Sequence, residues 1–329
     1  MGKMATREAY GRTLQEIGSD EKVVVFDADL AGSTNTGRFK KDFPERFFDM
    51  GIAEANMVAC AAGMATCGKI AFVSSFAMFA TERACEQIRN SVCYPNLNVK
   101  VCASHAGITV GEDGASHQCL EDLSIMRSLP DMKVICPADA ASARMAVKAA
   151  YENDGPFYVR LARLATDSVY GEFGEDVDFT LGKAHMVKDG TDVTIIACGY
   201  MVEQAVEALN ILESEGISAR LLDMHTIKPI DKEAVIKASK DTGCIVTCEE
   251  HSIIGGLGSA VAEVLVEDAP CPMLRVGVKD VFGRSGTPAE LMAYYHLTGA
   301  DIADKAKKAI ALKDKDQRIT RAPFPSGSR

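Results

Sequence analysis

Short apolar strands alternate with helices along most of this chain, and few folds accommodate that alternation. Five short apolar segments with polar residues at or near their ends are typical of strands: "EKVVVFDADL" (21–30), "KIAFVSSF" (69–76), "NVKVCAS" (98–104), "MKVICPAD" (132–139) and "PFYVRLAR" (156–163). Helical segments separate them, for example "AASARMAVKAAYEND" (140–154). Strands and helices of this length predict a mostly parallel sheet that helices cover on both faces.

The alternation stops near residue 164 and restarts near residue 191. The stretch between is polar, acidic and contains glycines, which is typical of a linker. The sequence therefore predicts an α/β protein of two three-layer domains, the second smaller than the first. We expect the first domain at 1–165, a linker at 166–190, the second domain at 191–312 and a loose tail at 313–329, where apolar periodicity ends.

The composition argues against several classes of function. The net charge of −10 argues against a nucleic-acid partner, because phosphate backbones require a basic face, but a local basic pocket can still bind small anions. The sequence has no run of about 18 apolar residues, so we expect no membrane span. Its 11 cysteines are scattered through apolar stretches without a CxxC motif. This pattern favours buried thiols in a reducing cytoplasm over disulfides or metal ligands.

Polar clusters follow several predicted strands, at the positions where open α/β sheets bind ligands. The most informative cluster is "SHAGITVGEDGASHQ", which gathers His105, Glu112, Asp113 and His117 around three glycines. Glycines allow a backbone to approach a ligand closely, and histidine suits acid–base or anion-binding chemistry. We expect such chemistry here; the alternative is a solvated loop whose histidines cap local turns.

Glu54 lies near the start of an otherwise apolar helix of small residues, in "DMGIAEANMVACAAGMA". An acid in the first turn can simply complement the helix dipole. The alternative is a buried, desolvated carboxylate whose raised proton affinity suits proton chemistry. Phe76 and Phe79 also allow two interpretations, either a helix face in the core at spacing i, i+3 or an aromatic shelf for a flat heterocycle.

Taken together, these segments resemble the C-terminal half of transketolase over nearly the whole chain. The specific motifs are "GEDGASHQ" and the glutamate of "GIAEAN", supported by "DADLAGSTN", "SSFAMFATERACEQIRN" and "RLAR". The resemblance implies a thiamine-diphosphate pyrimidine-binding domain followed by a transketolase C-terminal domain. A one-piece transketolase has a preceding domain in which a "GDG" and a downstream Asn bind the metal, and this chain has no GDG triplet. We therefore expect one subunit of a split transketolase.

The resemblance also implies roles for individual residues. The glutamate that hydrogen-bonds the aminopyrimidine of thiamine diphosphate matches Glu54, where a dry site favours the imino tautomer that generates the nucleophile. Phe76 and Phe79 match residues that stack on the pyrimidine, and Asp29 matches an acid close to the cofactor. A third aromatic residue is expected near position 82, where this chain has Glu82.

Further matches concern the substrate. His117 matches a histidine that contacts the donor sugar and its intermediate, and Asp113 matches an acid that hydrogen-bonds a substrate hydroxyl. Two arginines and a histidine suit a phosphate group, because arginine binds it bidentately. The residues that match the phosphate-binding positions of the family are His105, Ser33, Arg163 and Arg7.

The function that this resemblance implies is transfer of a two-carbon ketol unit from a ketose phosphate to an aldose phosphate, as in the pentose phosphate pathway. We expect no metal ligand in this chain. An N-terminal partner subunit is expected to hold Mg²⁺ and the diphosphate, in an α2β2 heterotetramer, and this chain alone is expected to be inactive.

Two alternatives stay open. The β-subunit of a 2-oxoacid dehydrogenase and deoxyxylulose-phosphate synthase are related enzymes, but the former does not usually carry "GEDGASHQ" and the latter needs an attached first domain. The second alternative is a non-catalytic interaction protein on the same fold. A desolvated Glu54 counts against it, because burying a carboxylate costs free energy and a scaffold does not require one.

Overall fold

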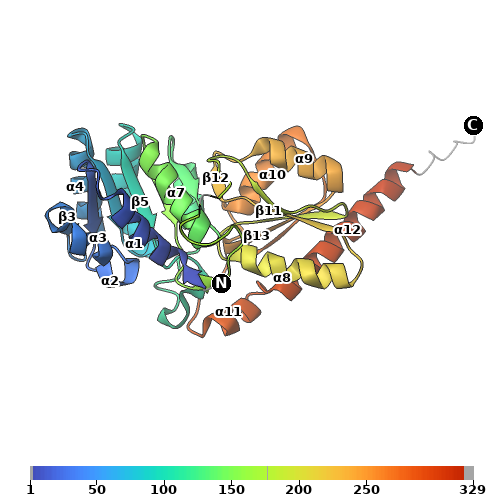
Figure 1. Cartoon of the computed structure of the whole chain (residues 1–329). Helices are drawn as coiled ribbons and strands as arrows, with labels where there is room; N and C mark the ends of the chain where they lie inside the picture. Colours follow the sequence, from blue (N-terminus) through green and yellow to red (C-terminus); the bar gives the residue numbers. More distant parts are fainter. Residues whose placement is uncertain (1–2, 176, 322–329) are drawn as a thin grey trace, which may run out of the picture.

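The first domain is built around a sheet with the strand order β12-β6-β7-β5-β4-β2-β3 (Figure 1). The computed structural model describes residues 3–175 and 177–321. The strands contributed by the first half of the chain are β2 (Val23–Asp27), β3 (Phe47–Asp49), β4 (Ile70–Ser74), β5 (Val99–Ala103), β6 (Lys133–Ile135) and β7 (Phe157–Arg160). They pair in parallel, and strands such as β2 are buried at every position because both faces are covered.

Helices cover the two faces of this sheet. On one face, α1 (Thr6–Ile17) and α7 (Ala140–Glu152) pack together over alternate strand residues. On the other face lies α4 (Glu54–Thr66). The remaining elements are α2 (Ala31–Thr34), α3 (Gly37–Asp42), η1 (Pro44–Arg46), α5 (Cys85–Gln87) between the π-helical segments η2 (Phe79–Arg83) and η3 (Ile88–Cys93), the 3-10 segment η4 (Ile108–Asp113), and α6 (Asp122–Ser128). A two-stranded ladder joins β1 (Met4–Ala5) to β8 (Ala165–Thr166).

The second domain has a five-stranded sheet in the order β14-β13-β10-β11-β9. Its strands are β9 (His185–Lys188), β10 (Val193–Ala197), β11 (Ala219–Asp223), β13 (Ile245–Ser252) and β14 (Met273–Val278). Its helices are α8 (Met201–Ser214), α9 (Lys232–Thr242), α10 (Leu257–Asp268), α11 (Pro288–Tyr294) and α12 (Gly299–Arg321). All its strands are parallel except β9. The two predicted α/β domains are therefore present.

Two predicted boundaries differ from the structure. The predicted linker, 166–190, contains β9, an edge strand whose side chains are only partly buried and which therefore lacks an apolar signature. The predicted loose tail from residue 313 continues α12 as far as Arg321. The apolar pattern ends in this segment because the helix projects beyond the second domain, as Figure 1 shows. The Lys and Asp residues of the segment are still compatible with a helix. Residues 322–329 of the predicted tail lie outside the described part of the chain.

One strand from the second half of the chain completes the first sheet. β12 (Thr226–Lys228) follows β11, yet it pairs antiparallel with β6 at the edge of the other domain's sheet. Buried residues around this crossing form one continuous apolar cluster with the first domain. The two domains are thus joined by backbone hydrogen bonds as well as by packing.

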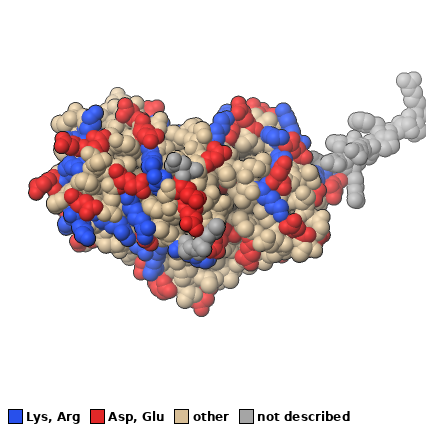
Figure 2. Space-filling view, in the orientation of Figure 1, with Lys and Arg blue, Asp and Glu red and all other residues tan. Residues whose placement is uncertain are grey.

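The surface is mixed in charge. On the face shown in Figure 2, Lys and Arg side chains are interspersed with Asp and Glu over both domains. Across residues 3–175 and 177–321, we find no helix with the length and apolar character that a membrane crossing requires.

Candidate active site

The predicted site residues lie at the carboxyl end of the first sheet. Ser33 follows β2, Phe76 follows β4, His105 follows β5 and Arg163 follows β7. These four strands are neighbours and run in parallel, so the loops after them meet at one edge. The ladder between β4 and β5 extends into this edge through a bridge between Phe76 and Ser104.

Glu54 is the first residue of α4, and its side chain points into the protein. It is 3% exposed. Among the described residues, its carboxylate has only long hydrogen-bond contacts, 3.4 Å from Ser75 Oγ and 3.3 and 3.4 Å from Nη1 of the half-exposed Arg83. Glu54 is therefore buried, as the second interpretation requires, while its place in the first turn of α4 also complements the helix dipole. A buried carboxylate with such weak partners can accept a further donor.

Aromatic rings lie beside this carboxylate. The Phe76 and Phe79 rings are 16° from parallel with centroids 6.0 Å apart, and Phe76 stacks on His105 at 3.9 Å. Phe79 meets His117 edge-on at 5.2 Å. The Arg83 guanidinium lies 4.2 Å over the Phe79 ring while it contacts Glu54. One guanidinium therefore connects the carboxylate and the ring, so the two groups lie close together.

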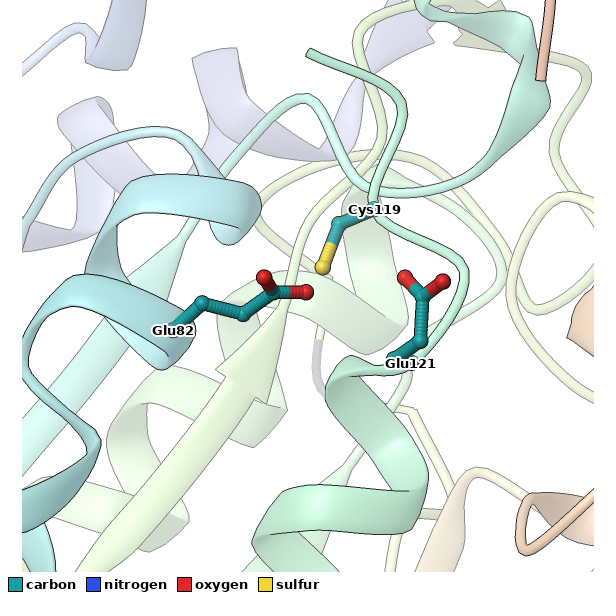
Figure 3. Close-up of side chains that lie close together, drawn as sticks. All are labelled: Glu82, Cys119 and Glu121. Carbon is teal, nitrogen blue, oxygen red and sulfur yellow. The ribbon is translucent and has the colours of Figure 1, made fainter. Parts of the chain in front are cut away.

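Glu82, at the position where the resemblance predicts an aromatic residue, lies in a cluster of potential metal ligands. Its carboxylate, the Cys119 thiol and the Glu121 carboxylate lie within 4.8 Å of one another, as Figure 3 shows. Burial, together with the charges of Glu121 and Asp122, raises the pKa of Glu82. Cys119 lies 3.8 Å from Thr81 Oγ1, and Glu121 accepts a hydrogen bond from the Leu120 amide. A thiol is a poor ligand for Mg²⁺, so this cluster does not fit the expected metal.

A basic cluster adjoins the aromatic rings. Arg7 donates from Nη1 to the Ser33 carbonyl at 2.6 Å and from Nε to the Arg163 carbonyl at 3.2 Å. Arg163 donates to the Val110 carbonyl and lies 3.5 Å from the Glu112 carboxylate. Burial and the nearby charge of Arg163 lower the pKa of Arg7. Backbone carbonyls fix the positions of both guanidinium groups, and two fixed guanidinium groups can bind a small anion.

His105 joins the aromatic and basic clusters. It is buried, and its Nδ1 lies 2.9 Å from Ser104 Oγ. Burial lowers its pKa to about 3, with Arg7, Arg163 and His117 adding to the effect. His105 is therefore neutral at pH 7 and can bind an anion as a hydrogen-bond donor. The sequence analysis grouped it with the two arginines as a phosphate-binding residue and did not predict its neutral state.

The remaining predicted residues lie at the rim. His117 is partly buried, with Nδ1 3.0 Å from Ser116 Oγ. Asp113 is exposed at the end of η4. Asp29 is exposed and adopts a left-handed backbone (φ 64°), and its amide donates to Asp49 Oδ1 at 3.1 Å. The loops after β2 and β5 therefore determine the positions of Asp29 and Asp113. Neither residue has a hydrogen bond to Glu54 among the described residues.

Sequence reasoning missed a buried acid beneath the Ser33 loop. Asp27, at the end of β2, accepts hydrogen bonds from the Leu30 amide at 2.6 Å and from the Thr34 and Thr36 hydroxyls at 2.7 and 2.8 Å. Burial raises its pKa to about 6, against the effect of these donors. The signal was present, since an acid that ends a fully apolar strand and precedes two threonines is typical of a loop anchor. Arg83 was also missed, although its i, i+4 spacing from Phe79 offered a signal.

The chemistry of Glu54 and Phe79 fits the aminopyrimidine half of thiamine diphosphate. The under-bonded, buried Glu54 carboxylate suits a ring donor, and the exposed part of the Phe79 ring suits the face of a heterocycle. Within residues 3–175 and 177–321, the one cluster of potential metal ligands found is the Glu82 cluster.

Comparisons with known proteins agree with this geometry. Residues 2–168 match the pyrimidine-binding domain of transketolase and residues 182–302 match the transketolase C-terminal domain. A "Putative transketolase C-terminal section" of Methanocaldococcus jannaschii is 54% identical over 301 residues, which cover 91% of this chain and 94% of that protein. A 6-deoxy-6-sulfo-D-fructose transketolase subunit of a Clostridium species is 44% identical, over 94% of this chain and 95% of its own. A solved "Split gene transketolase, inactive beta4 tetramer" is 52% identical, with a TM-score of 0.86, and covers 95% of this chain and 100% of that one.

Proposed function

The chain belongs to the transketolase family and corresponds to the C-terminal subunit of a split transketolase, and we propose that it forms an active enzyme only together with an N-terminal subunit. The reaction is transfer of a two-carbon ketol unit from a ketose phosphate to an aldose phosphate. The observation that carries the proposal is the buried Glu54 carboxylate, which lies beside the phenylalanine rings and has only long contacts.

In this proposal the chain holds the aminopyrimidine of thiamine diphosphate. When bound, thiamine diphosphate would supply the carbon nucleophile that ketol transfer needs. Glu54 shares a proton with a ring nitrogen, and its burial keeps water from competing for that proton. Phe76 and Phe79 contact the ring face and exclude water, and Asp29 lies on the adjacent loop.

The basic cluster binds the anionic end of the sugar. Arg7 and Arg163 supply the charge, while Ser33 and the neutral His105 supply hydrogen bonds. The relative named for a sulfonated fructose supports a site for sugars with an anionic end. Asp113 and His117, on the loop after β5, then contact the sugar hydroxyls and the reacting carbons.

An N-terminal subunit completes the site by holding Mg²⁺ and the diphosphate, in an α2β2 assembly. The solved relative described as an inactive β4 tetramer supports this dependence on a second chain. All eleven cysteines are free thiols, which supports a reducing cytoplasmic compartment.

The decisive experiment mixes this chain with its N-terminal partner, Mg²⁺ and thiamine diphosphate, and follows transfer from xylulose 5-phosphate. We expect activity from the mixture and none from this chain alone. Glu54→Gln should lower kcat by about 100-fold or more, the size of a lost proton-transfer contribution, with an unchanged thermal midpoint. Glu233→Gln is the matched control, because Glu233 also lies in the first turn of a helix but is exposed.

Two results would contradict the proposal. Turnover of xylulose 5-phosphate by this chain alone would exclude dependence on a partner. Oxidation of pyruvate by the mixture with an acceptor dye, without sugar transfer, would assign the chain to the 2-oxoacid dehydrogenases instead.

A further inference from the structure

The loop that carries Asp113 and His117 has a backbone that needs outside support. Within ten residues, His105, Gly107, Gly111 and Gly114 all have positive φ, between 56° and 84°. For His105 this conformation is unfavourable, and for the glycines it is one of many accessible conformations. The loop therefore keeps one shape only where neighbouring elements fix it.

The second domain supplies a buried acid at this loop. Glu250, on β13, is 2% exposed, and its Oε1 accepts hydrogen bonds from the Thr109 amide at 2.5 Å and the Thr109 hydroxyl at 2.6 Å. A side chain at Gly107 would overlap the Glu250 carboxylate, so the carboxylate fills the space that the glycine leaves. Two short hydrogen bonds to one carboxylate oxygen restrain the loop at its start.

Neutral contacts, two of which involve the second domain, restrain the rest of the loop. Gln118 donates from Nε2 to the carbonyl of Gly111 at 3.0 Å and to that of Arg284, in the second domain, at 2.9 Å. Pro288, at the start of α11, packs against Gly111. The loop thus rests on the second domain along most of its length, and Glu250 provides its ionisable contact.

We propose that Glu250 is a positioning residue that holds the loop of Asp113 and His117 in place for the sugar substrate, and that this support is a function of the C-terminal domain. The inference rests on the proposed function for its kinetic consequences, because Glu250 acts through Thr109 and touches neither cofactor nor sugar. The structural part, restraint of the loop, holds for the chain by itself.

The chemistry of the contact suggests which substitution preserves it. Burial raises the pKa of Glu250 to about 7, and Arg160 opposes this rise. Because both Thr109 donors bind the same oxygen, a neutral acceptor of the same shape can replace the carboxylate. Glu250→Gln should therefore retain the loop, whereas Glu250→Ala removes the acceptor entirely.

The neighbouring Glu249 is a matched control. It is equally buried on β13, but it accepts hydrogen bonds from the Leu257 and Gly258 amides at 2.7 and 2.9 Å, at the start of α10. Consecutive strand residues point to opposite faces, so the two acids serve different elements. Glu249→Ala should weaken the fold without releasing the loop.

The test measures hydrogen–deuterium exchange of residues 107–114 in the chain and steady-state kinetics of the two-chain enzyme. Glu250→Ala and Thr109→Val should speed exchange in this loop and raise the KM for xylulose 5-phosphate by about tenfold, the loss expected for one buried hydrogen bond. Glu250→Gln should keep both the loop's protection from exchange and the KM close to those of the wild type. Glu249→Ala should leave the loop's exchange and the KM unchanged while lowering the thermal midpoint.

The exchange measurement separates this inference from the proposed function. Unchanged loop exchange in both Glu250→Ala and Thr109→Val would overturn the inference, as would the same effect from Glu249→Ala. If Glu250→Ala does not fold, Thr109→Val decides alone, since it removes only the hydroxyl. Absence of ketol transfer by the wild-type mixture would contradict the proposed function, while the exchange data would still decide whether Glu250 restrains the loop.

Discussion

At the scale of single residues, Arg83 contacts both Glu54 and Phe79 in the cofactor-free chain. Its guanidinium covers Phe79 at 4.2 Å and lies 3.3 Å from the Glu54 carboxylate. Both contacts are those that the proposed function assigns to the aminopyrimidine. Binding of the ring therefore requires the half-exposed Arg83 side chain to move aside, and its departure leaves Glu54 free to bind the ring.

Removal of Arg83 should act in opposite directions on stability and on binding. Arg83→Ala leaves the buried Glu54 without its cationic neighbour, so the cofactor-free chain should lose about 1–3 kcal/mol in its free energy of unfolding. The same change removes a competitor, so the two-chain enzyme should bind thiamine diphosphate several-fold more tightly by calorimetry. Arg89→Ala is the control, because Arg89 is exposed and its guanidinium donates to the neighbouring Asn90. Weaker cofactor binding in Arg83→Ala would show that Arg83 contacts the bound ring.

The sequence identified residues close along the chain better than pairs distant along it. The burial of Glu54 and the meeting of His105, His117 and Phe76 at one edge followed from strand ends and from the family motifs. The pairs Arg83–Glu54 and Glu250–Thr109 did not, because their members are 29 and 141 residues apart and no local pattern links them. The neutral state of His105 also depends on burial, which a motif does not report.

At the scale of elements, the segment between the two domains is held by buried acids. Asp139, the N-cap of α7, accepts hydrogen bonds from the amides of Val169 and Tyr170 at 2.7 and 2.9 Å. The Tyr170 hydroxyl donates to Asp223 Oδ2, at the end of β11, at 2.6 Å, and the Tyr170 ring stacks on His185 at 4.2 Å. This part of the connecting segment is therefore packed, although its sequence is polar.

Asp223 should make the stability of the chain depend on pH. Burial raises its pKa to about 8, above an ordinary value near 4, so the folded chain holds this proton more tightly than the unfolded chain. That contribution to stability is complete below pH 4 and is lost as pH rises to about 8. Asp223→Asn removes this titration. Between pH 5 and pH 9, the free energy of unfolding of the variant, measured in urea, should therefore rise by about a few kcal/mol relative to that of the wild type.

The exposed Asp304 provides the comparison for this prediction. Asp304→Asn should keep the pH profile of the wild type. An Asp223→Asn profile parallel to that of the wild type would show that the carboxyl is ionised in the folded chain throughout this range.

Element types followed from the sequence more reliably than element ends. The alternation predicted the parallel strands, because buried strands are apolar throughout. It did not predict β9, an edge strand with partly buried side chains, nor the extent of α12, whose final turns lie beyond the sheets. The π-helical segments η2 and η3 were not predicted either, because over one or two turns their apolar spacing cannot be distinguished from that of an α-helix.

At the scale of the whole molecule, the two domains behave as one packed unit. β12 completes the first sheet, and Asp122 and Arg160 form a buried ion pair at 2.7 Å. Arg160 also donates to the Glu250 carbonyl at 3.0 Å, which extends that pair into the second domain. Neither domain can unfold without leaving buried partners of the other exposed or unpaired.

The chain should therefore unfold in a single cooperative transition. The buried thiols of Cys102, in the first domain, and Cys248, in the second, provide one probe for each. Their labelling in increasing urea, followed by mass spectrometry, should give coincident midpoints that match circular dichroism. Labelling of one thiol at clearly lower urea would show that its domain unfolds independently.

The strand that crosses over has a practical consequence for anyone who wishes to obtain the pyrimidine-binding domain by itself. Its family boundary ends at residue 168, but β12 begins at Thr226, so such a fragment would leave the outer edge of β6 bare. Unpaired strand edges recruit strands from other molecules, and the fragment should therefore aggregate. A usable version would need the 226–228 segment grafted back beside β6, for example by circular permutation.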